Sequence, residues 1–354
     1  MKNKIITISF VLCIFLFAIL GLVFQDKEIS ETERRKLQQF PSFKLNGNYV
    51  VKLDKYVLDH FPLRDTFRSI KAFVNYNVLQ KLSNNDIYIQ DNYIFKSNYP
   101  TNYNSVQNFI NNIKTTQTFL TENNNTYIMI IPDKNYYLKT NNFLHIDYEY
   151  IYNKISELDI NVIDLRDTLT LEDYYETDTH WKQENLHKIV KLLSNTMDFE
   201  YLDKTYTENI FNDFYGVYFG ESAISRNPEK LTYLTSNTIL NARVKYLENN
   251  VLTTVYNNAK LQGLDAYEIF LDGASSYIEI TNPNATTNKE LVIFRDSFGS
   301  SISPLLIQGY SKITIIDNRY IRSIDYLKHI EFDNQDVLFL YSTLIVNDSG
   351  SLKN

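Results

Sequence analysis

The pattern of apolar and polar positions divides the chain into unlike regions. Residues 5–24 form a charge-free apolar run of about 20 residues, which is long enough to cross a hydrocarbon core of roughly 30 Å as a helix. Between residues 49 and 81 apolar positions recur at helical spacing, and Pro62 divides this region into two predicted helices. The alternating stretch at 87–95 surrounds an Asp91-Asn92 pair and therefore predicts a β-hairpin.

From residue 105 onward the pattern alternates between helix and strand. This alternation predicts an α/β fold in which helices cover both faces of a doubly wound, mainly parallel sheet. Between about 200 and 285, short alternating stretches predict a β-rich insertion that forms one wall of a cleft. The predicted helices are at 105–121, 148–158, 182–193, 302–308 and 321–330, and the predicted strands are at 127–131, 161–165, 291–294, 312–316 and 336–341.

We expect three parts along the chain: a cytoplasmic tip with a transmembrane anchor at 1–25, an extended polar stalk at 26–48, and the α/β domain at 49–354. Lys2 and Lys4 precede the apolar run, so the positive-inside rule keeps the N-terminus in the cytoplasm. A cleaved signal peptide is the alternative, but the end of the run offers no small-x-small cleavage site. We therefore predict a single-pass membrane protein whose domain lies outside the cytoplasm.

Composition narrows the possible partners. The only cysteine, Cys13, lies in the apolar run, so the domain contains no internal disulfide. Without Lys2 and Lys4, 33 basic residues face 42 acidic ones, a formal charge of −9 that argues against nucleic acid as a partner. This charge favours a neutral substrate over an anionic polymer. The 28 tyrosines suit a sugar-binding groove, although nucleotide bias also explains their number.

Two short blocks carry the residues with the clearest chemistry, Asp178-Thr179-His180-Trp181 and Asp296-Ser297-Phe298-Gly299. A serine hydroxyl is a poor nucleophile unless an imidazole accepts its proton, and the imidazole needs an acceptor that holds its tautomer. In an extended segment Asp178 and His180 share one face, while Thr179 points away. The blocks therefore predict Ser297 as nucleophile, His180 as base and Asp178 as the orienting carboxylate.

Ser297 follows a predicted buried strand and precedes a predicted helix. Gly299 suits a tight turn at the helix N-terminus, where free backbone amides can stabilise an oxyanion. The structural alternative is that Asp296-Ser297 only caps the helix.

Other residues near the predicted strand ends are weaker candidates. Lys134 and Arg319 are candidates for binding substrate or an oxyanion, and the alternative is that each forms an ordinary salt bridge. Tyr174 and Tyr175 are candidates for contacts to sugar rings, and the alternative is that both pack in the core. The remaining histidines lack the spacing of metal ligands, so we predict no metal and no cofactor.

At these residues the chain resembles the SGNH-hydrolase-like proteins of the alginate O-acetyltransferase type, which include the proteins named for an Asp-His-His-Trp (DHHW) motif. In that family the Asp and His precede the Ser, as they do here, and the resemblance implies the same three roles for Asp178, His180 and Ser297. Thr179 departs from the named motif, and Ala274 stands where an amide side chain is expected as an oxyanion donor. The resemblance also rests on Glu33–Leu37, Phe40–Pro41, Asp59–Arg64, Ile131–Lys134, Tyr267–Gly273 and Ile316–Arg319.

The resemblance implies a membrane-anchored O-acetyltransferase that modifies a polysaccharide through an acetyl-serine intermediate. It also implies that a membrane-bound O-acyltransferase supplies the acetyl group. On charge alone, a neutral glucan such as cellulose is favoured as the acceptor. Two alternatives stay open: an acetylesterase with the same triad, and a non-catalytic glycan-binding scaffold of an export assembly.

Overall fold

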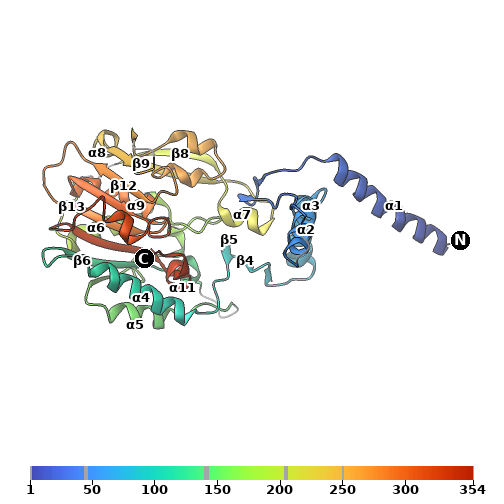
Figure 1. Ribbon diagram of the computed structural model, residues 1–354, viewed down its shortest axis with the longest axis horizontal. Coiled ribbons are helices and arrows are strands. Elements are labelled where there is room, and N and C mark those ends of the chain that lie inside the picture. The colour runs from blue at the N-terminus through green and yellow to red at the C-terminus, as the bar shows by residue number, and fades with distance from the viewer. Residues whose placement is uncertain (1, 44–46, 139–142, 203–205, 249–250, 354) are drawn as a thin grey trace. The chain divides into compact units, whose positions relative to one another are not determined.

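The computed structural model describes residues 2–43, 47–138, 143–202, 206–248 and 251–353. The chain forms two compact units (Figure 1). The first unit contains Met1–Ile89 and Val217–Asn227, and the second contains Gln90–Gly216 and Pro228–Asn354. The short segment from the middle of the chain thus folds with the N-terminal residues.

The first unit begins with helix α1 (Lys2–Val23), which is long and apolar enough to cross a membrane. Membrane anchors and signal sequences share this character. The two predicted helices on either side of Pro62 are confirmed as α2 (Gly47–Asp59) and α3 (Arg64–Phe73). One π turn, Val74–Val78, continues α3.

The predicted extended stalk instead contains a small antiparallel hairpin, β1 (Ile29–Ser30) with β2 (Arg35–Lys36). Charged side chains tie this hairpin to the helices. Arg35 Nη2 lies 2.6 Å from Asp59 Oδ1, and Glu33 Oε2 lies 2.7 Å from Arg64 Nη2. The segment folds because its charges find buried or half-buried partners on α2 and α3.

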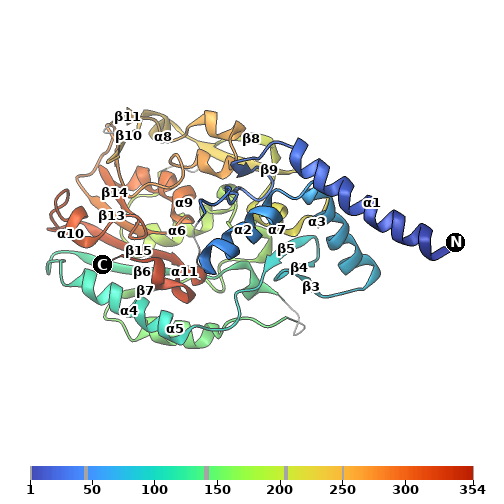
Figure 2. The ribbon, with the colours of Figure 1, turned by 45° about the vertical axis from the view of Figure 1, so that its right-hand side comes forward.

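The second unit is built on a mixed sheet whose strand order, within the described residues, is β11-β10-β12-β14-β13-β15-β6-β7. The strands from β14 to β7 are parallel, whereas β10, β11 and β12 add to one edge in antiparallel fashion (Figure 2). The bounds are β6 (Asn125–Ile131), β7 (Asn161–Asp164), β10 (Arg243–Tyr246), β11 (Leu252–Thr253), β12 (Tyr277–Thr281), β13 (Glu290–Arg295), β14 (Lys312–Ile316) and β15 (Asp336–Ser342).

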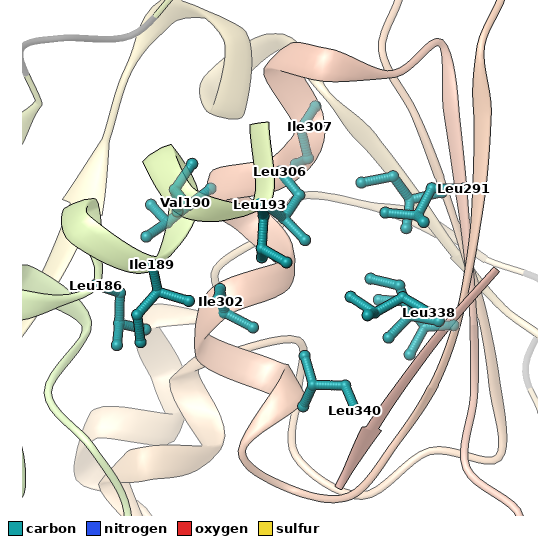
Figure 3. Close-up of a cluster of buried hydrophobic side chains, with 14 of the residues drawn as sticks. Leu186, Ile189, Val190, Leu193, Leu291, Ile302, Leu306, Ile307, Leu338 and Leu340 are labelled. Atoms are coloured by element: carbon teal, nitrogen blue, oxygen red, sulfur yellow. The ribbon is translucent and has the colours of Figure 1, made fainter. Parts of the chain in front are cut away.

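Helices cover both faces of this sheet, so the predicted doubly wound fold is confirmed. On one face α6 (His187–Thr196) and α9 (Gly299–Leu306) bury their apolar sides against the strands. Figure 3 shows Ile189 and Leu193 of α6, with Ile302 of α9, gathered in this core beside Leu338 of the sheet. The other face packs against α4 (Tyr103–Gln117), α5 (Tyr148–Ser156) and α10 (Ser323–Tyr326).

The predicted β-rich region is confirmed as strand-rich, but only part of it is an insertion. Strands β10 to β12 join the main sheet, while β8 (Thr207–Phe214) and β9 (Glu229–Thr235) form a separate antiparallel pair. The Asp91-Asn92 turn is also confirmed, with φ of 49° and 68°. The remaining elements are β3 (Ser83–Asn84), β4 (Ile87–Gln90), β5 (Tyr93–Lys96), α7 (Val217–Ser222), α8 (Asn237–Asn241) and α11 (Thr343–Asn347).

Candidate active site

The structure brings Asp178, His180 and Ser297 into one hydrogen-bonded chain. His180 Nε2 lies 2.8 Å from Ser297 Oγ, and His180 Nδ1 lies 2.6 Å from Asp178 Oδ1. Asp178 is buried at 1% exposure and His180 at 8%, whereas Ser297 is half-buried. A proton on Nδ1 binds the carboxylate, which leaves Nε2 free to accept the serine proton.

The Asp-His block forms the tip of an irregular hairpin rather than the predicted extended segment. Tyr174 and Trp181 form an antiparallel bridge at its base, and the Tyr175 amide donates to the His180 carbonyl at 3.1 Å. At the tip, the His180 amide donates to Asp178 Oδ1 at 3.0 Å. The bend itself, an Asx turn, therefore aims the carboxylate at the imidazole.

Lys134 holds this loop through its backbone carbonyls. Its side chain is buried, and Nζ donates to the carbonyls of Tyr175 at 3.1 Å, Glu176 at 3.2 Å and Asp178 at 2.7 Å. The ammonium also lies 5.4 Å from the centre of the Phe95 ring. The substrate-binding prediction for Lys134 is therefore replaced by a structural role in positioning Asp178.

Glu229, from the separate β8–β9 pair, holds the same loop through its amides. Its carboxylate accepts the Glu176 amide at 2.6 Å and the Thr177 amide at 2.7 Å. Gly216 packs so closely here that an added Cβ would lie 2.3 Å from the Thr177 carbonyl. The inserted strand pair thus helps to build the site, and only glycine fits at 216.

Tyr267 covers one face of the imidazole. Its ring stacks on His180 with a centroid distance of 3.9 Å and an interplanar angle of 8°. Tyr267 Oη and Trp181 Nε1 each lie 2.9 Å from Ser301 Oγ on α9. Burial is the main cause that raises the pKa of Tyr267 well above its usual value, so this hydroxyl remains a neutral donor. These contacts lock the plane of the histidine ring.

Ser297 lies in the predicted turn between strand and helix. The Phe298 amide donates to Asp296 Oδ1 at 3.0 Å and the Gly299 amide to the Asp296 carbonyl at 3.1 Å. Gly299 is required by close packing, because an added Cβ would lie 2.7 Å from Arg295 Cβ. Within the described chain the Ser297 amide has no acceptor. The Gly299 amide, predicted as an oxyanion donor, is thus already hydrogen-bonded, unlike the Ser297 amide.

Arg319 is fixed beside the same edge of the sheet by a two-pronged ion pair with Asp317, 2.9 Å from Nε to Oδ1 and 2.7 Å from Nη2 to Oδ2. Burial opposes its charge, but the hydrogen bonds to Asp317 and the charges of Asp317 and Asp296 raise the pKa of Arg319 above its usual value. No acceptor among the described residues contacts Nη1. The salt-bridge alternative is therefore present, and one N–H pair remains available to an anion.

Tyr174 and Tyr175 lie in the core, with 0% exposure each, so the predicted contacts to sugar rings do not occur in this arrangement. Tyr174 Oη donates to the Pro132 carbonyl. Tyr175 packs edge-on against Phe214 at 4.8 Å. Both rings instead support the base of the Asp-His hairpin.

Glu229 and the stacking of Tyr267 on His180 were not predictable from the sequence. Glu229 lies in a polar strand with no local motif, so no pattern marked it. Tyr267 was inside a segment that carried the family resemblance, but its contact with His180 depends on tertiary folding. Gly216 offered one signal, since an isolated glycine among large side chains often marks a close backbone approach.

Comparisons with known proteins show which family and which folds this chain resembles. The sequence profile of the DHHW protein family matches residues 150–316. A DHHW family protein from Eubacterium siraeum has a similar structure, with a TM-score of 0.63 and 19% identity over 77% of this chain and 97% of that chain. Bacillus cereus PatB1, in a structure with a sulfonyl adduct, gives a TM-score of 0.58 and 20% identity over 73% and 97%.

The O-acetyltransferase domain of Pseudomonas putida AlgJ matches with a TM-score of 0.44 and 10% identity over 74% of this chain and 92% of that domain. A search of the curated proteins found no match. The family profile spans both the Asp-His block and Ser297 and ends at Ile316, the last residue of β14. The similar structures share the α/β fold. Residues 150–316 therefore match the DHHW family model, and the chain shares the α/β fold of the DHHW family protein from Eubacterium siraeum.

Proposed function

We propose that this protein is a membrane-anchored, extracytoplasmic O-acetyltransferase that modifies a polysaccharide through an acetyl-serine intermediate. The observation that carries the proposal is the hydrogen-bonded chain from Asp178 through His180 to Ser297. An imidazole that touches both a carboxylate and a half-buried serine hydroxyl is the arrangement that activates serine for acyl transfer. The resemblance to acetyltransferases of the alginate type favours acetyl as the group transferred.

In the first half-reaction Ser297 Oγ attacks the carbonyl carbon of a donor acetyl ester, and His180 Nε2 takes the hydroxyl proton. The tetrahedral oxyanion binds the Ser297 amide, with Arg319 Nη1 as the second candidate donor. When the C–O bond of the donor breaks, His180 returns the proton to the leaving oxygen. Acetyl-Ser297 remains, and Asp178 stabilises the imidazolium while it carries the proton.

In the second half-reaction a sugar hydroxyl replaces the donor alcohol. His180 accepts the proton of that hydroxyl as its oxygen attacks acetyl-Ser297, and the proton returns to Ser297 Oγ when the ester bond breaks. The products are an O-acetylated sugar and free enzyme. Water in place of the sugar gives acetate, so exclusion of water decides between transferase and esterase.

The acceptor and the donor are parts of the same proposal. The formal charge of −9 beyond the apolar run favours a neutral glucan, such as cellulose, over an acidic polymer. A membrane-bound O-acyltransferase is the proposed acetyl donor, because α1 would hold the site close to the membrane from which that partner presents the group.

The test uses the full chain purified in detergent, an activated acetyl ester and neutral or anionic oligosaccharides. We expect mass spectrometry to find acetylated neutral oligosaccharide with the wild type and none with Ser297→Ala. Acetate release at the same rate with and without sugar would replace the transferase by an esterase. If Ser297→Ala matches the wild type in both products, the serine mechanism is wrong. Acetylation confined to anionic glycans would overturn the choice of acceptor.

A further inference from the structure

Helix α3 of the first unit exposes its apolar residues, while Arg64 and Arg68 on another side are half-buried. Phe67 is 43% exposed, Ile70 is 52% exposed and Phe73 is 61% exposed. On the opposite side Ala72 is fully buried, and Asn75 in the following π turn is only 9% exposed. A helix in contact with water alone normally has the reverse arrangement.

The π turn extends the same face with Val74 and Val78, which are 37% and 62% exposed. Positions 67, 70, 74 and 78 follow a spacing of three or four residues, so they form one stripe along the helix. The inward side is polar because Arg64 and Arg68 there bind Glu33, at 2.7 and 3.2 Å. This stripe is part of the folded unit and is not a consequence of local unfolding.

Helix α2 also exposes apolar side chains. Val50, Val51, Val57 and Leu58 are between 52% and 66% exposed, while Asp59 is buried with its carboxylate on Arg35. So many exposed apolar side chains on two consecutive helices indicate a contact with another apolar phase. We call the exposed residues of α2, α3 and the π turn the outer apolar face: Val50, Val51, Val57, Leu58, Phe67, Ile70, Phe73, Val74 and Val78.

Contacts of α1 with Phe61, just before α3, and with Phe67 of α3 indicate which phase covers this face. The Phe17 ring of α1 stacks on Phe61 with a centroid distance of 5.3 Å, and it lies 5.8 Å from the Phe67 ring. Phe17 precedes the last residue of α1, Val23, by six positions, which corresponds to about 9 Å along the helix. Helices that lie in a membrane interface bury their apolar side to about this depth, roughly 5–10 Å.

The polar residues at the margin fit lipid headgroups. Lys52 and Lys55 of α2 are exposed, and Lys71 of α3 is exposed with its ammonium on Asn85. Aromatic and aliphatic residues on one side with lysines at the border are typical of amphipathic helices that lie in the plane of a membrane. The lysines would meet phosphate groups, whose charge complements theirs.

From this arrangement we propose that the outer apolar face rests in the outer interface of the lipid bilayer that α1 crosses. The proposal rests on the anchor role of α1 in the proposed function, and it assigns a lipid-binding role to residues 47–78. The membrane then replaces water over the exposed side chains, and the first unit lies against the bilayer instead of standing away from it as a stalk.

The test places a fluorescent probe on the face in the full chain. Cys13 is the only cysteine, so a Cys13→Ser background allows one labelled cysteine at a time. Ile70→Cys and Val78→Cys place the probe on the outer apolar face, and Ser69→Cys places it on an exposed neighbouring position outside the stripe. Each protein is reconstituted into vesicles of phosphatidylcholine and phosphatidylglycerol, without any other protein.

Lipids that carry a quencher in the upper acyl chain should quench the probes at 70 and 78 severalfold more than the probe at 69. Aqueous iodide should show the opposite order. Equal quenching by iodide at all three sites would overturn the proposal, as would protection from both quenchers, which would mean that protein covers the face.

Flotation of the same vesicles tests whether the chain is anchored in the membrane, independently of where the outer apolar face lies. Chains that float while iodide reaches residue 70 contradict the outer-face proposal and leave the anchor intact. Chains that do not float contradict both. Acetylation of Ser297, measured on the same samples, reports on the chemistry independently of either result.

Discussion

Replacing Lys134 by Met tests how the site is held together. The ammonium donates to three backbone carbonyls of the loop that carries Asp178, with distances from 2.7 to 3.2 Å. Methionine has a similar volume but no donor, so the three carbonyls lose their buried partner. A hydrogen bond to a charged group contributes about 1.5–3 kcal/mol, and the loss is partly offset because no ammonium is then buried. We expect Lys134→Met to lower the free energy of unfolding by about 3 kcal/mol.

The same substitution should slow the chemistry without weakening substrate binding. Asp178 receives the shortest of the three contacts through its own carbonyl, so its carboxylate should shift relative to His180. Displacement of a catalytic group by about 1 Å costs on the order of 100-fold in rate. We expect kcat for release of acetate or transfer of acetyl to fall by about that factor, with KM nearly unchanged.

Steady-state kinetics and denaturant unfolding in detergent measure these effects. Lys182→Met is the matched control, because the Lys182 ammonium lies at the surface and donates to the Glu172 carbonyl at 3.2 Å. The control should keep its activity and lie within about 0.5 kcal/mol of wild-type stability. A Lys134→Met protein with normal kcat but a raised KM would show that Lys134 binds substrate, and the positioning argument would be wrong.

Three further predictions follow from other contacts. Gly216→Ala should destabilise the protein by about 1–3 kcal/mol and reduce activity, because the new Cβ meets the Thr177 carbonyl at 2.3 Å. Gly47→Ala, which has open space around it, should change neither stability nor activity in the same thermal unfolding and activity assays. Tyr267→Phe should retain most of the activity because the ring still stacks on His180, while Tyr267→Ala should lower kcat about 10-fold or more. Equal kcat for the two variants would refute a role for the stacked ring. Burial opposes the charge of Asp59, but hydrogen bonds from Arg35 and the Gln38 amide lower the pKa of Asp59 to about 2. Asp59 should therefore contribute about 1–2 kcal/mol to the free energy of unfolding above pH 4, and this contribution should be lost as the pH falls toward 2. An Asp59→Asn protein with an unchanged pH dependence of unfolding would contradict this.

The sheet and the two blocks at its carboxyl edge were predictable because their signals are local. Buried parallel strands are short continuous apolar runs, and β13 at Glu290–Arg295 and β15 at Asp336–Ser342 lie within one residue of their predicted ends. The predicted helix at 321–330 is wrong in length, since α10 spans only Ser323–Tyr326. Apolar residues in the turns before and after α10 also reach the core, so their spacing in the sequence resembles that of a longer helix.

Features that depend on contacts between distant segments were not predictable. Nothing near Lys134 in the sequence shows that its ammonium reaches carbonyls about 40 residues away. Tyr174 and Tyr175 were predicted to contact sugar but are buried. Amphipathic rings suit both a sugar-binding surface and a core, and only the fold decides which of the two they occupy. The exposed side of α3 also required the structure, since periodicity reveals that a helix has an apolar face but not which way that face points.

The most direct test of the account is whether Ser297 becomes acetylated, and whether this depends on the groups around it. The full-length protein is mixed with an activated acetyl ester, stopped in acid and digested, and the peptide containing Ser297 is analysed by mass spectrometry. We predict one acetyl group on Ser297 in the wild type, much slower labelling in His180→Ala and Asp178→Asn, and none on that peptide in Ser297→Ala. Labelling of Ser297 at the same rate in the wild type and in His180→Ala would contradict it, because the imidazole would then play no part in activating the serine.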